Sequence, residues 1–298
     1  HHREIIAMAD HIVDMGPEAG SRGGEITFQG DYSNLLKSET TTGRMLRYKS
    51  RLKDKIRQPN GLFRIEHAKL HNLKDLSVDI PLGVLTVIAG VAGSGKSSLM
   101  EVFQQQCDRP TIFIGQKNIG INLRSTPATY LDISDTIRKL FAQASHTNMQ
   151  LFSFNSKGGC PACGGKGTIV SDMAFMESIE TVCDVCHGTR YSQEILQYRY
   201  NGKSIAEVMD LSVEEALEFF SDQPFRPQLQ ALYDVGLGYL HLNQAMTTLS
   251  GGELQRVKLA SFLVKGETAQ PQLFIFDEPS TGLHFHDIQK LIKAFNSL

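Results

Sequence analysis

Short apolar runs alternate along the chain with stretches whose apolar residues recur every three or four positions. The run Val84–Ala89 is continuous and rich in β-branched residues, which predicts a buried strand, and Ser98–Phe103 predicts the start of a helix. Other predicted strands are Leu62–Leu70, Asp75–Ile80, Pro110–Gly115, Gln193–Tyr200 and Leu273–Phe276, and other predicted helices are Ser134–Ala144, Ser204–Met209, Val213–Phe220, Gln228–Val235, Glu253–Val264 and Ile288–Phe295. Such alternation is typical of an α/β fold.

The segment between the predicted strand and helix carries the first chemical signal. It matches the pattern G-x-x-x-x-G-K-[ST]. A strand that leads into a glycine loop and a helix N-terminus gathers backbone N–H groups at the positive end of a helix dipole. Lys96 is predicted to reach the outer phosphates, and the Ser97 hydroxyl to bind Mg²⁺. The predicted polyphosphate site consists of Gly90, Gly93, Ser94, Gly95, Lys96 and Ser97.

Four of the five cysteines form two C-x-x-C pairs. Cys160 and Cys163 precede Cys183 and Cys186, and nineteen residues separate the pairs. This spacing matches the zinc template C-x₂-C-x₁₅₋₂₀-C-x₂-C, and four thiolates make a closed, structural site. Disulfides and redox pairs are the alternatives, but a nucleotide site in the same chain favours a reducing compartment. Cys107 is the fifth cysteine, and we expect it in a helical core.

A Ser-Gly-Gly turn opens the predicted helix Glu253–Val264. Its residues Ser250, Gly251 and Gly252 place backbone N–H groups at a helix N-terminus, as the first loop does. We therefore predict that this turn also contacts nucleotide phosphate.

The predicted strand Leu273–Phe276 ends in two carboxylates, Asp277 and Glu278. A carboxylate at the carboxyl end of a strand can hold Mg²⁺, and we assign that role to Asp277. The next carboxylate can position or deprotonate an attacking water, and we assign that role to Glu278. The order of glycine loop, Ser-Gly-Gly turn and Asp-Glu pair is far more specific than any one of them.

Composition sets loose limits on the function. The chain has 298 residues, of which 41% are hydrophobic and 21% charged, as in ordinary globular proteins with one large or two smaller domains. No apolar run approaches the roughly 20 residues that span a bilayer, so we expect no membrane segment and a cytoplasmic protein. The net charge of −2 gives no overall argument for nucleic-acid binding.

Taken together, the motifs resemble those of ATP-binding-cassette ATPases. The four-cysteine insertion ahead of the Ser-Gly-Gly turn narrows the resemblance to the UvrA family, the damage-recognition ATPases of bacterial nucleotide excision repair, and to the second of their two cassettes. The matching segments cover essentially the whole chain: Asn72–Lys74, Arg124–Tyr130, Phe152–Asn155, Lys157–Gly159, Thr247–Ala260 and Thr281–His284.

The resemblance implies an ATP-binding-cassette P-loop fold with an inserted four-cysteine zinc module and a helical signature subdomain. The implied divisions are the end of a preceding cassette at 1–43, a basic linker at 44–60 and a second cassette at 61–298 that lacks its C-terminal part, with a zinc-finger insertion at 153–191 and the signature subdomain at 192–266. Residues 1–30 either dock on this cassette or hang off it in partial disorder, and we expect the second.

The resemblance also implies roles for residues and partners. Gln116, at the end of the strand predicted over 110–115, is implied to contact Mg²⁺ and the attacking water, next to the base Glu278. In this class, ATP lies between the phosphate loop of one cassette and the Ser-Gly-Gly helix of another. We therefore expect a second cassette and a homodimer partner, with a UvrB-like repair partner. Alone, the chain should bind ATP weakly and hydrolyse it slowly or not at all.

The zinc hairpin lies near double-stranded, damaged DNA in the family. Phosphate contact needs cations, but residues 167–182 hold acids and no Lys or Arg. The predicted DNA contacts are therefore Lys157, Lys166 and Arg190. The alternative is a purely structural zinc, which we call a zinc staple, that only holds the helix after the Ser-Gly-Gly turn in place. The basic residues of the 44–60 linker are either a DNA-facing tether or a solvated segment.

Two stretches are shorter than in repair-type members, from Lys96 to Gln116 and from Phe141 to Phe152. This shortening leaves a second function open, a UvrA-like ATPase of antibiotic or toxin self-resistance that does not act in general repair. A transporter ATPase subunit is a third alternative. It is disfavoured because transporter cassettes do not carry four zinc thiolates before the Ser-Gly-Gly turn.

Overall fold

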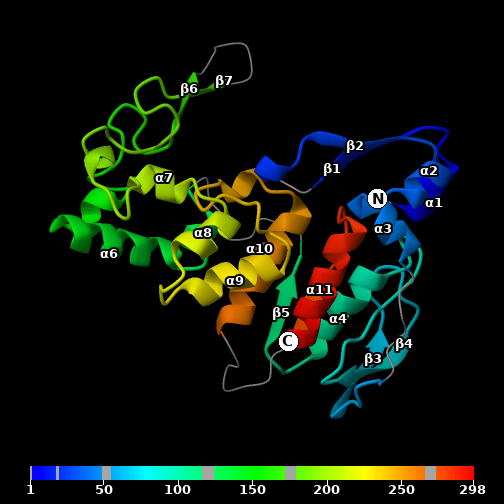
Figure 1. Cartoon of the computed structure of the whole chain (residues 1–298). Coiled ribbons are helices and arrows are strands. Elements are labelled where there is room, and N and C mark those ends of the chain that lie inside the picture. The colour runs from blue at the N-terminus through cyan, green and yellow to red at the C-terminus, as the bar shows by residue number, and fades with distance from the viewer. Residues whose placement is uncertain (1, 18–19, 49–54, 116–123, 172–178, 266–272) are drawn as a thin grey trace. The chain divides into compact units, whose positions relative to one another are not determined.

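The structure is a computed structural model that describes residues 2–17, 20–48, 55–115, 124–171, 179–265 and 273–298 (Figure 1). The chain forms two compact units, one from residues 1–117 and 251–298 and the other from residues 118–250. The second unit is thus an insertion in the sequence of the first. Gln116, predicted as a catalytic residue, lies outside the described residues.

The first unit begins with a small amino-terminal subdomain. Strand β1 (Ile12–Gly16) pairs antiparallel with β2 (Glu25–Gly30). The other elements are α1 (Arg3–Met8), a 3₁₀ turn (Gly20–Arg22), α2 (Tyr32–Lys37) and α3 (Thr41–Arg47). Helix α3 begins where it does because the Thr40 hydroxyl accepts the Gly43 N–H and caps the free end of the helix.

This subdomain is docked on the carboxyl-terminal helix α11 (Phe285–Ser297) of the same unit. The Arg3 guanidinium lies 5.0 Å from the centre of the Phe285 ring, and the Thr42 hydroxyl contacts the His284 ring. In Figure 1, α3 lies beside the start of α11. The expectation that the first thirty residues hang off the core was therefore wrong for the described part of that segment.

In its described residues, the remainder of the first unit consists of four strands and three helices. Its elements are β3 (Gly61–Ala68) and β4 (Leu76–Leu82), an antiparallel pair; β5 (Thr111–Ile114) and β8 (Leu273–Phe276), a parallel pair; and the helices α4 (Lys96–Gln106), α10 (Gly251–Lys265) and α11. Helix α4 packs on β3, and the buried core between them consists of Ile65, Ala68, Leu73, Val102, Phe103 and Ile275.

The predicted buried strand Val84–Ala89 was wrong. This segment has no regular secondary structure, and the side chains of Leu85 and Val87 are 50% and 77% exposed. A strand needs a hydrogen-bonded neighbour, and within the described residues β5 and β8 pair only with each other. The apolar pattern shows that the side chains of this segment suit a strand, but it does not show whether another strand lies beside it to form hydrogen bonds.

The second unit is mainly helical. Its elements are α5 (Pro127–Tyr130), α6 (Ile133–Ser145), α7 (Ile205–Met209), α8 (Val213–Phe219), α9 (Arg226–Asp234), an antiparallel hairpin of β6 (Thr168–Ser171) and β7 (Ile179–Val182), and 3₁₀ turns at Met149–Phe152, Ile195–Gln197 and Met246–Thr248. Phe141, Phe152 and Phe220 are fully buried, and contacts through the Tyr200 ring join them into one aromatic cluster.

Local signals account for most of these boundaries. Helices α7 and α8 each begin with a capping box, in which Ser204 exchanges hydrogen bonds with Glu207 and Ser212 with Glu215. The prediction of a strand at Gln193–Tyr200 was wrong, because the segment forms a 3₁₀ turn and then only an isolated β-bridge at Tyr200. A short apolar run does not by itself distinguish a strand from other buried segments.

Candidate nucleotide site and metal centre

The predicted phosphate loop leads directly into α4. Gly95 is the N-cap of this eleven-residue helix, with φ at 95°, and Lys96 is its first residue. The Lys96 ammonium donates to the carbonyls of Gly90 and Val91, each at 3.0 Å, and so spans the loop. The free N–H groups of the helix start and an adjacent ammonium form an arrangement that suits a polyphosphate.

Two glycines of the loop lie close to neighbouring side chains, and the positive φ of Gly95 also favours glycine. A Cβ on Gly90 would lie 2.6 Å from the Ser94 hydroxyl, and a Cβ on Gly95 would lie 2.9 Å from Oδ1 of Asn72. The Asn72 amide also donates to the Gly93 carbonyl at 2.8 Å. Asn72 therefore holds the loop in shape. Sequence reasoning used Asn72 only as a matching position, and did not assign it to the site.

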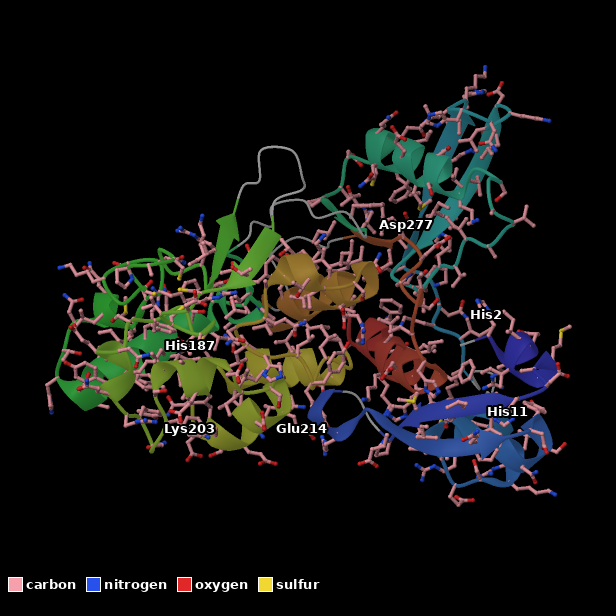
Figure 2. All side chains as sticks on the ribbon, turned by 90° about the horizontal axis from the view of Figure 1, so that it is seen from above. His2, His11, His187, Lys203, Glu214 and Asp277 are labelled. Atoms are coloured by element: carbon pink, nitrogen blue, oxygen red, sulfur yellow. The ribbon has the colours of Figure 1, made fainter. Side chains whose placement is uncertain are left out.

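The two carboxylates follow β8 directly, as their order in the sequence predicts. β8 is in register with β5, and the Asp277 N–H donates to the Ile114 carbonyl at 3.4 Å. Figure 2 labels Asp277 at this end of the strand. Both carboxylates are exposed, and Glu278 has φ at 47°, a left-handed conformation that residues other than glycine rarely adopt. Such strain is often found at functional positions.

Helix α10 joins the ends of the two parallel strands. The Gln255 side chain is only 2% exposed, and its amide donates to the carbonyls of Asp277 at 2.7 Å and Ile114 at 3.3 Å. One turn along, the Lys258 ammonium donates to the Gly115 carbonyl at 3.4 Å, and burial lowers the pKa of Lys258. The helix thus fixes the backbone just before Gln116 and just before Glu278.

Gln255 and Lys258 were missed as site residues at the sequence level. The available signal was the signature pattern Leu-Ser-Gly-Gly-Glu-x-Gln-Arg, in which Gln255 stands. The predicted turn residues Gly251 and Gly252 begin α10, and a Cβ on Gly252 would lie 3.0 Å from the Thr281 carbonyl. Gly252 therefore lies against the loop that carries Glu278.

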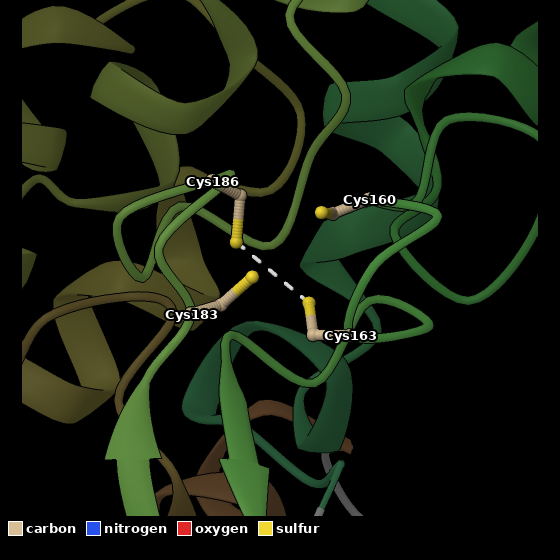
Figure 3. Close-up of side chains that lie close together, drawn as sticks. All are labelled: Cys160, Cys163, Cys183 and Cys186. Carbon is tan, nitrogen blue, oxygen red and sulfur yellow. Dashed lines mark hydrogen bonds between the residues drawn. The ribbon is translucent and has the colours of Figure 1, made fainter.

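The four predicted zinc ligands come together in the second unit (Figure 3). Cys160, Cys163, Cys183 and Cys186 are buried, and their Sγ atoms all lie within 4.8 Å of one another. The Cys163 and Cys186 Sγ atoms are 3.7 Å apart, and the cysteines are free of disulfides. A tetrahedral zinc with Zn–S bonds of about 2.3 Å requires sulfurs about 3.8 Å apart. The sulfur positions therefore fit zinc.

The two C-x-x-C turns follow the same backbone path. In both, the first, second and fourth residues after the second cysteine have positive φ: Gly164, Gly165 and Gly167 in one turn, and His187, Gly188 and Arg190 in the other. This path aims the N–H of the fourth residue at sulfur, and the Gly167 N–H donates to Cys163 Sγ at 3.2 Å. Amides aimed at thiolates stabilise their charge and orient them for a metal.

The thiols do not ionise alike. Burial raises the pKa of Cys163, but the Gly167 N–H and the neighbouring thiols outweigh it and lower this pKa to about 7. Burial raises the pKa of Cys186 to about 12. The Cys163 thiolate therefore forms near neutral pH, whereas the Cys186 thiol resists ionisation in the absence of a cation beside it.

The three cations predicted to contact DNA have different environments. Lys157 and Lys166 are exposed beside the first turn. Arg190 is half-buried, and its guanidinium lies 5.2 Å from the centre of the Phe154 ring. Arg190 therefore has a packing role whether or not it also contacts phosphate.

Comparison with known proteins decides the family. The family described as ABC transporter matches residues 73–281, which include the phosphate loop, Asp277 and Glu278. The UvrABC system protein A of Methanothermobacter thermautotrophicus is 43% identical over 333 residues, which cover 100% of this chain and 34% of that protein. The chain belongs to the UvrA family of ATP-binding-cassette ATPases.

Other UvrA proteins agree with this assignment. The UvrABC system protein A of Clostridium perfringens is 42% identical over 332 residues, which cover 100% of this chain and 35% of that protein. A crystal structure of UvrA2 from Deinococcus radiodurans matches with a TM-score of 0.88 at 38% identity, covering 100% of this chain and 40% of that one. The predicted family and the cassette fold are thereby confirmed.

The UvrA-family chain spans about a third of the length of these curated relatives. The alignment to the first relative runs over 333 positions against 298 residues here, so that relative carries residues that this chain lacks. None of the helices in the described part of the chain has the length and apolar character needed to cross a lipid bilayer.

Proposed function

We propose that this UvrA-family chain binds and hydrolyses ATP, with Mg²⁺, as part of a DNA-binding subunit that recognises damaged DNA in nucleotide excision repair. The observation that carries the ATPase proposal is the arrangement in one compact unit of a phosphate loop at the start of α4, an Asp-Glu pair at the end of β8, and α10 tied to that pair. The names of the relatives, UvrABC system protein A, support the repair role.

The residues divide the catalytic work. The loop N–H groups and Lys96 hold the β- and γ-phosphates, and Ser97 and Asp277 are the proposed ligands of Mg²⁺, which neutralises charge on the phosphates when bound. Glu278 and Gln116 orient the attacking water, and Glu278 accepts its proton. Gln255 holds the Asp277 carbonyl against α10, and this hydrogen bond fixes the direction of the Asp-Glu pair.

The proposed partners follow from the number of motifs. The chain has one phosphate loop and one Ser-Gly-Gly turn, Ser250–Gly252, and in this class each nucleotide needs one of each from different cassettes. We therefore propose a second cassette and a homodimer partner, and a UvrB-like protein as the repair partner. The reduced cysteines fit a reducing compartment, and we propose the cytoplasm.

ATP turnover per chain should rise with protein concentration and fall toward zero in dilute, monomeric protein, because assembly completes the site. Phosphate release, measured across a concentration series with the oligomeric state followed by analytical ultracentrifugation, checks this. Rapid hydrolysis by strictly monomeric chain would contradict the proposed two-cassette site.

Removing the exposed lysines of the zinc module, Lys157→Ala with Lys166→Ala, should weaken DNA binding. The slope of log Kd against log salt concentration should fall by about one unit for each DNA phosphate that the variant no longer neutralises. Fluorescence anisotropy on a duplex at several salt concentrations measures both the affinity and the slope. Zinc content should not change, because the backbone N–H of Lys166, which donates to the Cys163 carbonyl, stays in place when both lysine side chains are removed.

The matched control is Lys139→Ala, an exposed lysine on α6 outside the zinc module. Arg190→Ala is a poor first choice, because Arg190 also packs on Phe154. Unchanged affinity and salt dependence in the double variant would favour the zinc staple as the sole role of the module.

A self-resistance ATPase is the second candidate function. One observation favours it: the relatives named UvrABC system protein A carry residues that this chain lacks within the matched region. Filter binding of the complete protein to damaged and undamaged duplexes, with and without ATP, separates the two. Preference for damaged DNA supports repair, whereas equal or absent binding supports the resistance role. The transporter alternative is not favoured, because the four buried sulfurs form one cluster that fits zinc and transporter cassettes do not carry such a site.

A further inference from the structure

Three side chains far apart in the sequence form a continuous hydrogen-bonded chain in the first unit. The Thr42 hydroxyl, on α3, lies 2.7 Å from Oδ1 of Asp14, on β1, and 3.2 Å from Nε2 of His284, which caps α11. The contacts join positions 28 and 242 residues apart. They connect the amino-terminal subdomain to the end of the loop that begins at Glu278.

The direction of each hydrogen bond is fixed by the helix cap. His284 Nδ1 accepts the His286 N–H at 3.3 Å, so Nδ1 carries no proton. The proton of a neutral ring is then on Nε2, which donates to the Thr42 oxygen, and the Thr42 hydroxyl donates to the Asp14 carboxylate. Burial lowers the pKa of His284, against Asp287 and Asp14, which raise it, and so favours the neutral ring.

The amino-terminal end of this chain is firmly held. The Thr27 hydroxyl donates to the Asp14 carbonyl at 3.1 Å and reaches its carboxylate at 3.4 Å. Arg3 donates to the Met45 carbonyl at 2.9 Å, and its guanidinium stacks on Phe285, the residue after His284. The subdomain thus grips the start of α11 at two neighbouring residues.

The other end of the chain leads to the proposed catalytic base. Two consecutive turns connect Glu278 to His284: the Thr281 N–H donates to the Glu278 carbonyl at 3.1 Å, and the Leu283 N–H donates to the Ser280 carbonyl at 3.2 Å. Leu283 is buried and anchors the second turn. A short, internally bonded loop therefore joins His284 to Glu278, which is itself held in a strained conformation.

We propose that Asp14, Thr42 and His284 form a positioning relay, through which the amino-terminal subdomain (residues 3–47) sets the Glu278 loop and controls ATP hydrolysis rather than ATP binding. The hydrolysis part of this proposal rests on the proposed function. None of the three residues acts on ATP directly. They act through the loop, so the position of the subdomain determines the position of Glu278 at the proposed active site.

The first test uses the 298-residue chain with ¹⁵N-labelled histidine. The His284 resonances are identified by their absence in His284→Gln, and the wild-type ring should show a protonated Nε2 and an unprotonated Nδ1. Thr42→Val removes the acceptor with little change of shape and should shift these resonances. It should also speed amide hydrogen exchange at 279–283. Thr42→Ser keeps the hydroxyl and should restore both, and Thr41→Val makes the same chemical change outside the relay.

The second test measures hydrolysis under the conditions in which the assembled wild-type protein turns over. Thr42→Val should lower kcat by roughly tenfold or more, since small displacements of catalytic groups are costly, while KM for ATP stays unchanged. Thr42→Ser should recover kcat.

Three results would overturn the relay: unchanged His284 resonances in Thr42→Val, effects no larger than those of Thr41→Val, or a lower melting temperature with unchanged kcat. If the wild-type chain hydrolyses no ATP under any condition, the proposed function fails. The resonance and exchange measurements still decide whether the relay exists.

Discussion

Replacing Glu278 with Gln should slow ATP hydrolysis by roughly 10²–10⁴-fold while sparing ATP binding. Glu278 follows β8 and Asp277, the proposed Mg²⁺ ligand, and its carboxylate is exposed. An amide of the same shape keeps the loop and removes only the group that accepts the proton of the attacking water. Single-turnover phosphate release and binding of a fluorescent ATP analogue, measured on the same preparations, check this expectation.

Two further variants sharpen the test of Glu278. Glu101→Gln removes an exposed carboxylate from α4 and should leave hydrolysis unchanged. Glu278→Gly removes the same base and also relieves the positive φ of 47°, so it should lose hydrolysis without loss of thermal stability. If ATP binding collapsed together with hydrolysis in Glu278→Gln, Glu278 would instead have a structural role.

Replacing Cys183 with Ser should release zinc and unfold the surroundings of the two cysteine turns in the second unit. Cys183 is fully buried, and its sulfur lies in a cluster whose spacing fits a tetrahedral ion. Zinc held by such sites contributes about 10–16 kcal/mol in small zinc-finger peptides at neutral pH, so its loss removes much of the local folding energy. Metal analysis of the purified protein and circular-dichroism melting measure the two effects.

Cys107→Ser is the matched control for the zinc experiment. Cys107 packs against the core of the first unit, outside the four-sulfur cluster, and this variant should keep its zinc. Zinc affinity should also weaken as pH falls, because protons compete for the thiolates, and Cys186, with its pKa raised to about 12, holds its proton tightly. Stoichiometric zinc in Cys183→Ser would contradict a four-thiolate site.

Sequence reasoning succeeded where the physical signal is local. Helix α10 starts at the predicted Ser-Gly-Gly turn, and α4 starts at Lys96, because glycines and free N–H groups mark helix starts regardless of the rest of the fold. The four cysteines cluster as their spacing predicts, because two short turns suffice to bring them together. Each of these signals is contained in a short stretch of sequence.

Sequence reasoning failed where the outcome depends on distant partners. Val84–Ala89 has the side chains of a strand but lacks a neighbouring strand among the described residues. Gln255 lies on a helix and joins the ends of two strands, and its contact with Ile114 spans 141 residues of sequence. The docking of the amino-terminal subdomain depends on Arg3 meeting Phe285 and Thr42 meeting His284, and no spacing rule connects such positions.

The shared backbone path of the two cysteine turns has a consequence for engineering this protein. The first turn has glycine at all three left-handed positions, whereas the second carries His187 and Arg190 at two of them. A side chain in that conformation lowers stability by roughly 1 kcal/mol relative to glycine. His187→Gly should therefore raise the melting temperature, and the His187 side chain is not a metal ligand in a four-thiolate site. The first turn offers no such substitution, because glycine already stands at its three left-handed positions.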